Sequence, residues 1–346
     1  MKRHKRYKDY GFFDQDIRLS KLSQLGDPLE KLNDGIDFEK FRNFLEESLF
    51  TEPKGPGGRP PFDYVLMFKI LILQRYYNLS DEQVEYQIND RMSFMRFLDL
   101  TIADDIPDSR TVWAFREQIT NLGLVEKLFD LFLTELNSLG LIVNEGKIVD
   151  ASFVETPKQR NSKAVNEQIK NGDTAELFND NLHRKAQKDT DARWVKKNNV
   201  NYFGYKNHIK TDAKSKIITK YHVTDASVHD SNATDILLDE NDKGEPFYAD
   251  SAYTGESQEN IISEKEMINQ VCEKGYRNKP LTDEQKSSNT EKSRVRSRVE
   301  HIFGFMEQSM NQMYIHTVGI KRATAAIGLM NLTYNMYRKI QLLAIS

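Results

Sequence analysis

Hydrophobic and polar residues alternate along the chain with two different periods, and the change falls near Gly140. Before it, apolar residues recur at helical spacing, as in residues 37–49, which read DFEKFRNFLEESL. Residues 62–77 are strongly apolar and predict a buried helix, and the Gly and Pro residues at 55–61 separate the two segments. The pattern therefore predicts a helical region over residues 1–140.

Capping signals refine this helical region. A helix is expected to begin after Ser80, where Gln83 completes a capping box, and to run to about Leu98. Further helices are expected over residues 110–120, capped by Asp108 or Ser109, and over residues 124–139. Short helices joined by tight turns fit a helix-turn-helix module, and they fit an ordinary helical bundle equally well.

Beyond Gly140 short runs rich in β-branched and aromatic residues predict strands. They lie at residues 147–154, 202–211, 216–224, 245–249 and 267–272. Helices are expected at 231–238, at 257–265 and from Ser293 onward, with a break at 316–319 and a last helix at 321–344 that packs on the sheet. A polar insertion at about 157–199 is expected to be a loop or an excursion from the sheet. Residues 141–346 thus predict an α/β domain, a sheet flanked by helices.

Three carboxylates stand in unusual surroundings for acidic residues. Asp150 interrupts the apolar run IVDASF, Asp250 follows the predicted strand PFYA, and Glu300 lies beside the apolar face of a predicted helix. Carboxylates from different elements could hold two divalent cations about 3.5–4 Å apart, which is an arrangement used in phosphodiester chemistry. Separate structural roles would explain each of them as well.

These segments resemble the three catalytic motifs of bacterial insertion-sequence transposases, which are DDE enzymes. The motifs are IVDASF at 148–153, FYADSAYTG at 247–255 and RSRVEHIFGFME at 296–307. Residues 202–210, 223–231, 58–63 and 106–111 also match, so the resemblance covers about residues 40–340. It implies a ribonuclease-H-like catalytic core with a mixed sheet, preceded by an all-helical DNA-binding domain.

The resemblance also implies an activity and its cofactor. Asp150, Asp250 and Glu300 would be catalytic and would bind two Mg²⁺ ions, which Mn²⁺ could replace. The enzyme would bind the terminal inverted repeats of its element, hydrolyse phosphodiester bonds to expose 3′-OH ends, and join those ends to target DNA. Two ends must be handled together, so a homodimer or higher assembly on double-stranded DNA is expected, in the cytoplasm.

Several basic and aromatic residues are candidate DNA contacts. The resemblance places Arg296 one helical turn before Glu300, where it would contact a phosphate, with Arg298 beside it. Lys206, His208 and Lys210 share one face of a predicted strand and would either grip phosphate or form a solvated edge. Trp113 and Trp194 could both stack on unpaired bases. Trp113 is expected in the core instead, which leaves Trp194, in the insertion, as the better DNA candidate. The string HDS at 229–231 could be a proton relay or a metal ligand, but Asp230 or Ser231 is expected to be a helix cap.

The sequence departs from the family pattern at two positions of the third motif. The family often has a lysine seven residues after the glutamate, and this chain has Glu307. The tyrosine expected three residues before Arg296 is Ser293. Neither departure affects the proposed metal ligands, but a phosphate contact is lost at position 307.

The net charge of the whole chain argues against nucleic acid as a partner, whereas the distribution of charge along the chain favours it. The 49 basic and 52 acidic residues give a net charge of −3, but they are unevenly distributed. Residues 183–197 hold six basic residues and two acids, residues 274–298 hold eight and three, and residues 1–10 hold five and one. Phosphate affinity depends on local charge, so we expect the segments 183–197 and 274–298 to flank the active site and binding to weaken with salt.

The cysteine content and hydropathy narrow the class of protein further. Cys272 is the only cysteine, which excludes an internal disulfide and a cysteine-based zinc cluster and fits a cytoplasmic protein. No stretch approaches 18 consecutive apolar residues. Two rival functions remain open, a structure-selective nuclease on the same fold and a domesticated DNA-binding protein without catalytic activity.

Overall fold

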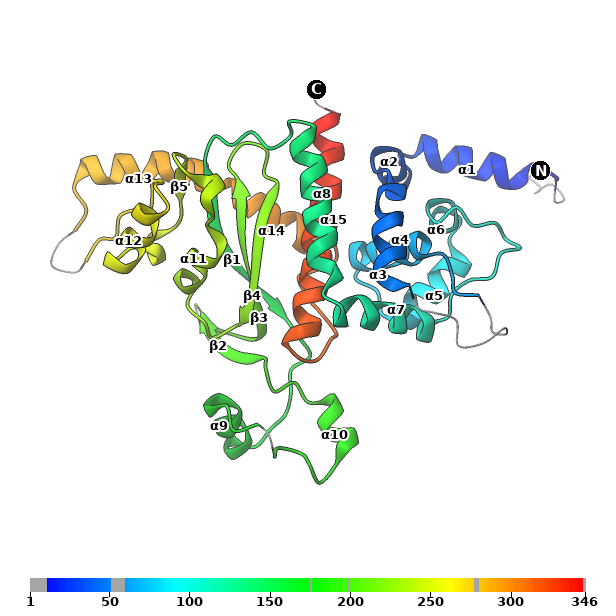
Figure 1. Ribbon diagram of the computed structural model, residues 1–346, viewed down its shortest axis with the longest axis horizontal. Coiled ribbons are helices and arrows are strands. Elements are labelled where there is room, and N and C mark those ends of the chain that lie inside the picture. Colours follow the sequence, from blue (N-terminus) through cyan, green and yellow to red (C-terminus); the bar gives the residue numbers. More distant parts are fainter. Residues whose placement is uncertain (1–10, 51–59, 175, 198, 277–279, 345–346) are drawn as a thin grey trace, which may run out of the picture.

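A mixed β-sheet forms the centre of the C-terminal half, seen in a computed structural model that describes residues 11–50, 60–174, 176–197, 199–276 and 280–344 (Figure 1). Its strands are β1 (Lys147–Glu155), β2 (Arg193–Lys197), β3 (Val200–Asp212), β4 (Ile218–Asp225), β5 (Pro246–Tyr248) and β6 (Ile268–Asn269). β3 pairs antiparallel with β1 and β4, whereas β5 pairs parallel with β1 and β6. The order β4-β3-β1-β5-β6 is the ribonuclease-H-like arrangement expected from the sequence.

The short strand β2 was not predicted, and it shares one edge of β3 with β4. β2 pairs with Val200–Gly204, and β4 pairs with β3 from Tyr205 onward. Gly204 stands at this change of partner with φ +150°, and a Cβ atom there would collide with the carbonyl oxygen of Val154. Only glycine tolerates this backbone angle and this close approach, so the switch depends on it.

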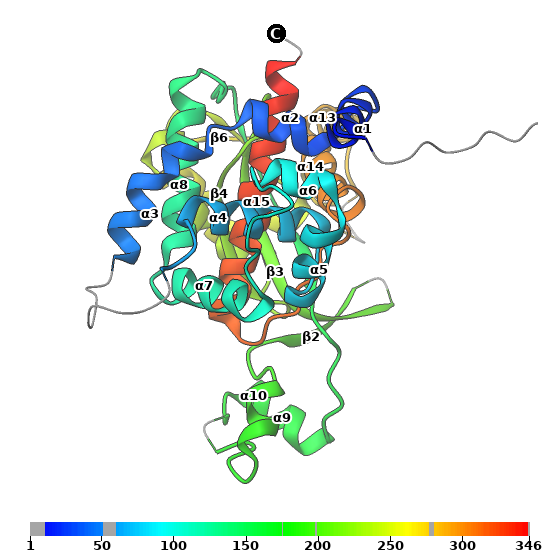
Figure 2. The ribbon, with the colours of Figure 1, turned by 90° about the vertical axis from the view of Figure 1, so that its right-hand side faces the viewer.

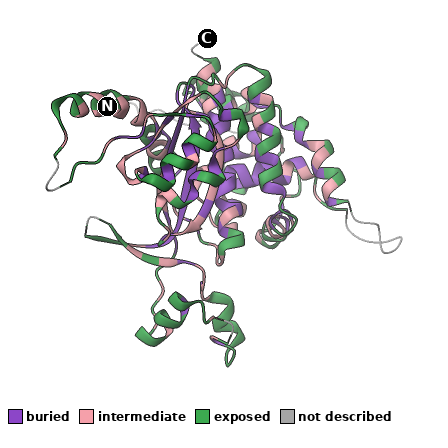
Figure 3. Cartoon of the chain, turned by 60° about the vertical axis from the view of Figure 1, so that its left-hand side comes forward, coloured by how far each residue is buried: buried purple, intermediate pink, exposed green. Residues whose placement is uncertain are grey.

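The polar insertion is more ordered than the sequence indicates. It contains α9 (Lys163–Asn171) and α10 (Leu182–Gln187) in addition to β2, so the expectation of a loop is wrong. Each helix begins with a side-chain cap, from Ser162 and from Asn181. Exposed residues dominate this part of the molecule (Figure 3). The helices have almost no buried apolar face, which is why hydrophobic periodicity did not reveal them.

Two aspartates tie the end of the insertion to the last helix, α15 (Ile320–Leu343). The carboxylate of Asp189 is buried and accepts hydrogen bonds from the Tyr205 hydroxyl, at 2.7 Å, and from the backbone N–H of Gly319, at 3.2 Å. Asp191 accepts a hydrogen bond of 2.8 Å from the backbone N–H of Ile320. Negative charge at a helix N-terminus is favourable, so these bonds join the insertion to α15.

Helix α15 lies between the sheet and the N-terminal helices and contacts both (Figures 1 and 2). On the sheet side, the Asn335 amide donates to the carbonyl of Ile218 and accepts from its N–H, at 2.8 and 2.9 Å. On the other side, the Tyr337 and Tyr76 rings stack with their centroids 4.2 Å apart. The prediction that the last helix packs on the sheet is confirmed, and one hydrophobic core continues across it.

Helices fill the N-terminal region, as predicted. They are α1 (Asp14–Gln24), α2 (Pro28–Gly35), the 3₁₀ turn η1 (Phe38–Phe41), α3 (Arg42–Leu49), α4 (Tyr64–Tyr77), α5 (Asp81–Asp90), α6 (Met92–Phe97), α7 (Ser109–Asn121) and α8 (Leu124–Ser138). The capping box of Ser80 and Gln83 is present. The expected helix to Leu98 is instead broken at Arg91, whose backbone is extended. The glycines and Arg59 of the expected break lie outside the described residues, as do residues 1–10.

Two further groups of helices cover the sheet. On one side lie η2 (Asp230–Ala233), α11 (Thr234–Leu237), η3 (Glu240–Asp242), η4 (Ser251–Tyr253) and α12 (Glu256–Glu264). On the other lies α14 (Arg298–Gln308), which contacts α15 and β1 and follows α13 (Asp283–Arg296) (Figure 1). The cap of η2 is the His229 ring nitrogen rather than Asp230 or Ser231, because His229 is the last residue with extended backbone.

Candidate active site

The parallel pairing of β1 and β5 brings the first two candidate carboxylates together. Lys147 is opposite Phe247 and Ile148 is opposite Tyr248. Continuing this register by two residues places Asp150 beside Asp250, immediately after β5 ends. Ligands of α/β sheets bind at such carboxyl ends of strands. The Asp250 carboxylate accepts a hydrogen bond of 2.8 Å from the N–H of Ala252, which fixes it as the cap of η4.

Asp150 carries a negative charge that its surroundings do not fully compensate. Burial raises the pKa of Asp150 to about 6, and the nearby charges of Asp250 and Asp230 act in the same direction. A hydrogen bond from the Ala151 N–H and the charge of Arg296 lower this pKa but do not cancel the rise. A raised carboxyl pKa means that the ionised form lacks stabilisation, which an added cation would supply.

Arg296 bridges the first and third candidate carboxylates. Its guanidinium donates to Asp150 Oδ2 at 3.2 Å and to Glu300 Oε1 at 3.1 Å. The helix breaks between them, since α13 ends at Arg296 and α14 begins at Arg298, and Ser297 separates the two. The Glu300 side chain is 63% exposed and can rotate, whereas Asp150 is fixed in the sheet. The structure therefore brings all three predicted residues to one place.

The donor set suits a hard divalent cation. Carboxylate oxygens are the ligands that Mg²⁺ and Mn²⁺ prefer. The raised pKa of Asp150 shows that its carboxylate would be stabilised by an added positive charge. Among the described residues no three acids, histidines or cysteines gather closely enough to hold an ion, because Arg296 lies between Asp150 and Glu300. Asp150, Asp250 and Glu300 would hold the metal once this guanidinium moved away.

Two residues beside the site were not assigned to it from the sequence. The charges of Asp150, Asp230 and Asp250 all act on Tyr253, whose hydroxyl is buried without a hydrogen-bond partner among the described residues. Burial and these three charges raise the pKa of Tyr253 well above its ordinary value. Asp230 forms an ion pair of 2.8 Å with Lys206. The string HDS at 229–231 contained Asp230 but gave no sign that it approaches the other carboxylates.

The three basic residues of β3 face the interior, so the expectations of a phosphate grip and of a solvated edge both need correction. Lys206, His208 and Lys210 are at most 7% exposed. Asp150 is opposite Ile209 and Ala151 is opposite His208. Cross-strand neighbours share a face, so the three basic residues lie on the sheet face opposite to Asp150.

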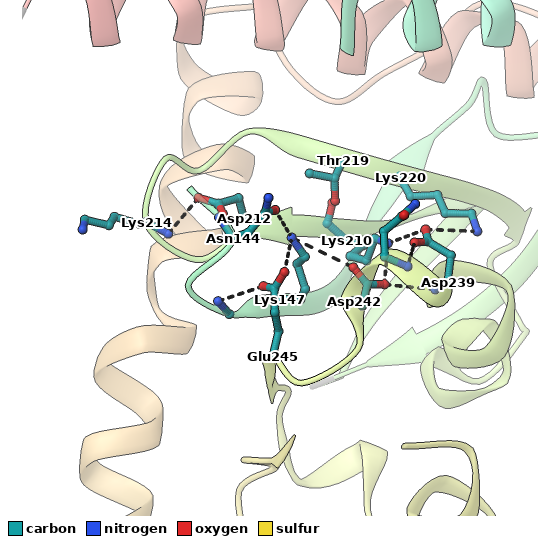
Figure 4. Close-up of polar contacts among 12 residues, drawn as sticks. Asn144, Lys147, Lys210, Asp212, Lys214, Thr219, Lys220, Asp239, Asp242 and Glu245 are labelled. Carbon is teal, nitrogen blue, oxygen red and sulfur yellow. Dashed lines mark hydrogen bonds and ion pairs between the residues drawn. The ribbon is translucent and has the colours of Figure 1, made fainter. Parts of the chain in front are cut away.

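Each of these basic side chains has an internal partner. Lys210 lies 2.7 Å from Asp239 and 2.6 Å from Asp242, and Lys147 joins the same cluster through Glu245 at 3.2 Å (Figure 4). The His208 ring forms a hydrogen bond of 2.8 Å with the Thr224 hydroxyl. The acidic partners of Lys210 and Lys147 lie in the turns that follow β4, far from both lysines in the sequence. These ion pairs are therefore visible in the structure and could not be predicted from the sequence.

The buried His208 predicts how stability depends on pH. Burial lowers the pKa of His208 to about 4, against 6.5 in an unfolded chain; Asp230 opposes this shift, and Lys206 and His222 reinforce it. Between pH 6.5 and 4 the His208 ring therefore binds a proton in the unfolded chain and stays neutral in the folded chain. We expect the free energy of unfolding to fall by up to about 3 kcal/mol as pH drops from 6.5 towards 4.

Urea unfolding at a series of pH values measures this slope. His208→Gln should flatten it between pH 6.5 and 4, while the exposed His183→Gln should leave it unchanged. An unchanged slope in His208→Gln would contradict the assignment of the effect to this ring.

The remaining candidates take different positions. Trp194 in β2 is 43% exposed and packs against Phe203, so its surface remains open to a ligand. Arg298 donates to the carbonyl of Ala213 at 2.7 Å. Trp113 is 50% exposed, so its expected place in the core is wrong: only one face of α7 is buried, and Trp113 lies off it.

The departures from the third motif have local roles. Glu307, which stands where the family often has lysine, accepts a hydrogen bond of 2.8 Å from the N–H of Met313 and so holds the turn after α14. The Ser293 hydroxyl lies 3.7 Å from the Cys272 sulfur. Of the two basic segments, 274–298 ends at the site through Arg296. The segment 183–197 falls in α10, below the sheet in Figure 1, and in β2, at the lower end of the sheet.

Comparison with known proteins agrees with this fold. The family described as "Transposase DDE domain" matches residues 143–336, and the family described as "Transposase domain (DUF772)" matches residues 17–118. The first match spans more than half of the 346 residues, and the chain therefore belongs to the DDE-domain transposase family.

One solved structure is also similar. It is described as the cryo-EM structure of a piggyBac transposase synaptic complex with hairpin DNA. The two sequences are 11% identical, and the similarity covers 93% of this chain and 76% of that chain with a TM-score of 0.44.

No helix in the described part of this chain is long and apolar enough to cross a membrane.

Proposed function

We propose that this transposase binds the terminal inverted repeats of its element, hydrolyses a phosphodiester bond to expose a 3′-OH, and joins that end to target DNA. The observation that carries the proposal is the meeting of Asp150 with Asp250 through the β1–β5 register, with Glu300 brought in by α14. Family membership supports the same reaction class. Two element ends must be joined in one event, which favours a pair of chains on the DNA.

The carboxylates define the place of reaction, and the basic residues around them orient the DNA. Two Mg²⁺ ions held by Asp150, Asp250 and Glu300 would activate the attacking oxygen and stabilise the leaving one. Asp150 is fixed in β1, and Asp250 is held as the cap of η4, so neither carboxylate has to move once Arg296 has left Asp150. Arg296 would contact a DNA phosphate after it leaves Asp150. Trp194 remains available to stack on a base.

A cleavage assay tests the proposal. DNA carrying the inverted repeats that flank the gene is incubated with the full chain and Mg²⁺, and the products are separated on a denaturing gel. We expect nicking at the repeat ends and, with target DNA, joined products. Binding without cutting in either Mg²⁺ or Mn²⁺ would favour the DNA-binding rival. Cutting of branched DNA without preference for the repeats would favour the nuclease.

A second prediction concerns the contact between Arg296 and the carboxylates. In the DNA-free protein its positive charge competes with a metal cation for Asp150 and Glu300. We expect Arg296→Gln to bind Mn²⁺ about tenfold more tightly in a calorimetric titration without DNA, which corresponds to about 1.4 kcal/mol. The same variant should cleave DNA more slowly, because it lacks the phosphate contact.

Arg294→Gln provides the matched control, because Arg294 lies in the same last turn of α13 and is exposed. It should leave Mn²⁺ affinity unchanged. A loss of Mn²⁺ affinity in Arg296→Gln would show that the guanidinium supports the metal site instead of competing for it.

A further inference from the structure

A cleft remote from the three carboxylates collects buried polar atoms that lack partners. It has a volume of about 510 Å³ and lies where α4, α5 and α7 meet the start of α15 and the insertion helix α10. Among its lining side chains, Arg75 Nε, Arg116 Nε and Thr317 Oγ1 are all buried without a hydrogen bond in the part of the chain described. Buried polar groups are nearly always paired, so three in one cleft indicate a missing ligand.

Arg75 is the centre of this cluster. Its guanidinium donates to the Asn78 side chain and to the Tyr314 carbonyl, and it meets no carboxylate among the described residues. Burial lowers the pKa of Arg75 to about 10, and the positive charge of Arg116 adds to the effect. A buried cation without a counter-ion is costly, and an anionic ligand would remove the cost.

Two of the three acids that line the cleft are already engaged by other cations, and the third, Glu82, is exposed. Arg116 holds Asp81 in a two-pronged pair at 2.5 and 2.8 Å. Arg322 holds Glu117 in the same way, with its two shortest contacts at 2.7 Å. These pairs leave Arg75 as the cation whose charge the cleft does not balance. Nearby, Trp113 offers a half-exposed aromatic surface at the cleft.

We propose that this cleft is a phosphate-binding site, in which Arg75 and Thr317 bind the phosphate group and Trp113 borders the attached sugar or base. Guanidinium and hydroxyl donors suit phosphate oxygens, and an indole face suits a nucleobase. The volume is typical of small-molecule sites. The preference for phosphate over other anions rests on the proposed function, since DNA supplies such groups. The source is a backbone phosphate of bound DNA or a free nucleotide.

The cleft would also link three parts of the chain. Arg75 comes from α4, Thr317 precedes α15, and Ala186 of the insertion helix α10 lines the same space. A phosphate bound between them would bring the N-terminal helices, the insertion and the catalytic half onto one ligand.

Calorimetric titration of the full chain without divalent metal tests the site. The probes are inorganic phosphate, deoxyadenosine monophosphate and a repeat-bearing duplex, with acetate as the carboxylate control. We expect phosphate and the mononucleotide to bind and acetate to bind at least tenfold more weakly. Thr317→Val, which removes the unpaired hydroxyl and keeps the volume, should weaken phosphate binding several-fold.

Arg75→Met separates a ligand site from a structural role. It should weaken phosphate binding at least tenfold, yet the ligand-free variant should melt no lower than wild type, because a buried unpaired charge is removed. Arg18→Gln, at an exposed arginine of α1 that does not line the cleft, should bind phosphate as wild type does.

The duplex distinguishes the two sources of the phosphate group. Weaker duplex binding by Arg75→Met identifies a DNA backbone phosphate, and unchanged duplex binding with loss of mononucleotide binding identifies a free nucleotide. The proposal is overturned if no phosphate probe binds, or if Arg75→Met lowers the melting temperature and leaves phosphate affinity unchanged. Since no cleavage is measured, a protein that fails to cut DNA can still pass this test.

Discussion

Asp150→Asn is expected to reduce DNA cleavage at least about a thousandfold while leaving binding to the repeats intact. The change keeps the shape of the side chain and removes the charge that holds a cation, which is worth several kcal/mol of transition-state stabilisation. Because burial and neighbouring acids raise the pKa of Asp150 to about 6, the neutral amide should not destabilise the metal-free fold at pH 7. Binding is measured by gel shift and cleavage by rate under excess enzyme.

Asp235→Asn is the matched control, because its carboxylate is 65% exposed and pairs only with Lys265 among the described residues. It should cut DNA at the wild-type rate. Asp250→Asn provides a second test of the same site and should show the same loss as Asp150→Asn. Near-normal cleavage by both site variants would remove this cluster from the reaction.

Asp242→Ala is expected to give the largest loss of stability, about 3–5 kcal/mol in urea unfolding. Asp242 is 1% exposed, and its carboxylate lies 2.6 Å from Lys210 Nζ and 4.0 Å from Lys147 Nζ (Figure 4). Its removal leaves positive charge inside the fold with less compensation. It also removes the acceptor for the Asp239 N–H, at 3.0 Å. Glu145→Ala, which breaks the exposed pair with Lys214, should cost less than about 1 kcal/mol.

The double variant Asp242→Leu with Lys210→Met sharpens the interpretation. Replacing both charges together by apolar side chains should recover much of the lost stability, since the cost comes from an unpaired buried charge. If Asp242→Ala loses no more than the Glu145 control, then Asp239 and Glu245 already satisfy the two lysines, and the network is redundant.

Features carried by local patterns could be predicted from the sequence. The cap at Ser80, the strands around Asp150 and the long last helix all follow from the order of residue types within a short window. The break between α5 and α6 at Arg91 could not be predicted, because the helical spacing of apolar residues continues through it. Strand β2 could not either, since its pairing with β3 supplies hydrogen bonds that no local pattern encodes.

Some features of the candidate site could likewise be predicted from the sequence, and others could not. The motifs indicated Asp150, Asp250 and Glu300, and the structure brings them together, although their catalytic role remains a proposal. The contact of Arg296 with Asp150 joins residues 146 positions apart, so the sequence offered only its spacing to Glu300. The pairing of Lys210 could not be predicted from the sequence, because its partners Asp239 and Asp242 lie in turns about 30 residues further along the chain.

Helix α15 has a consequence for how the chain is made. Its residues close the core of the N-terminal helices and cover the sheet, yet they follow both in the chain and leave the ribosome after them. Helices α1 to α8 are therefore made before α15, and part of their apolar surface stays exposed while the half that contains the sheet is synthesised. A chain that stops before residue 320 would lack the helix both halves need, and it would be a substrate for chaperones and proteases instead of a separate DNA-binding fragment.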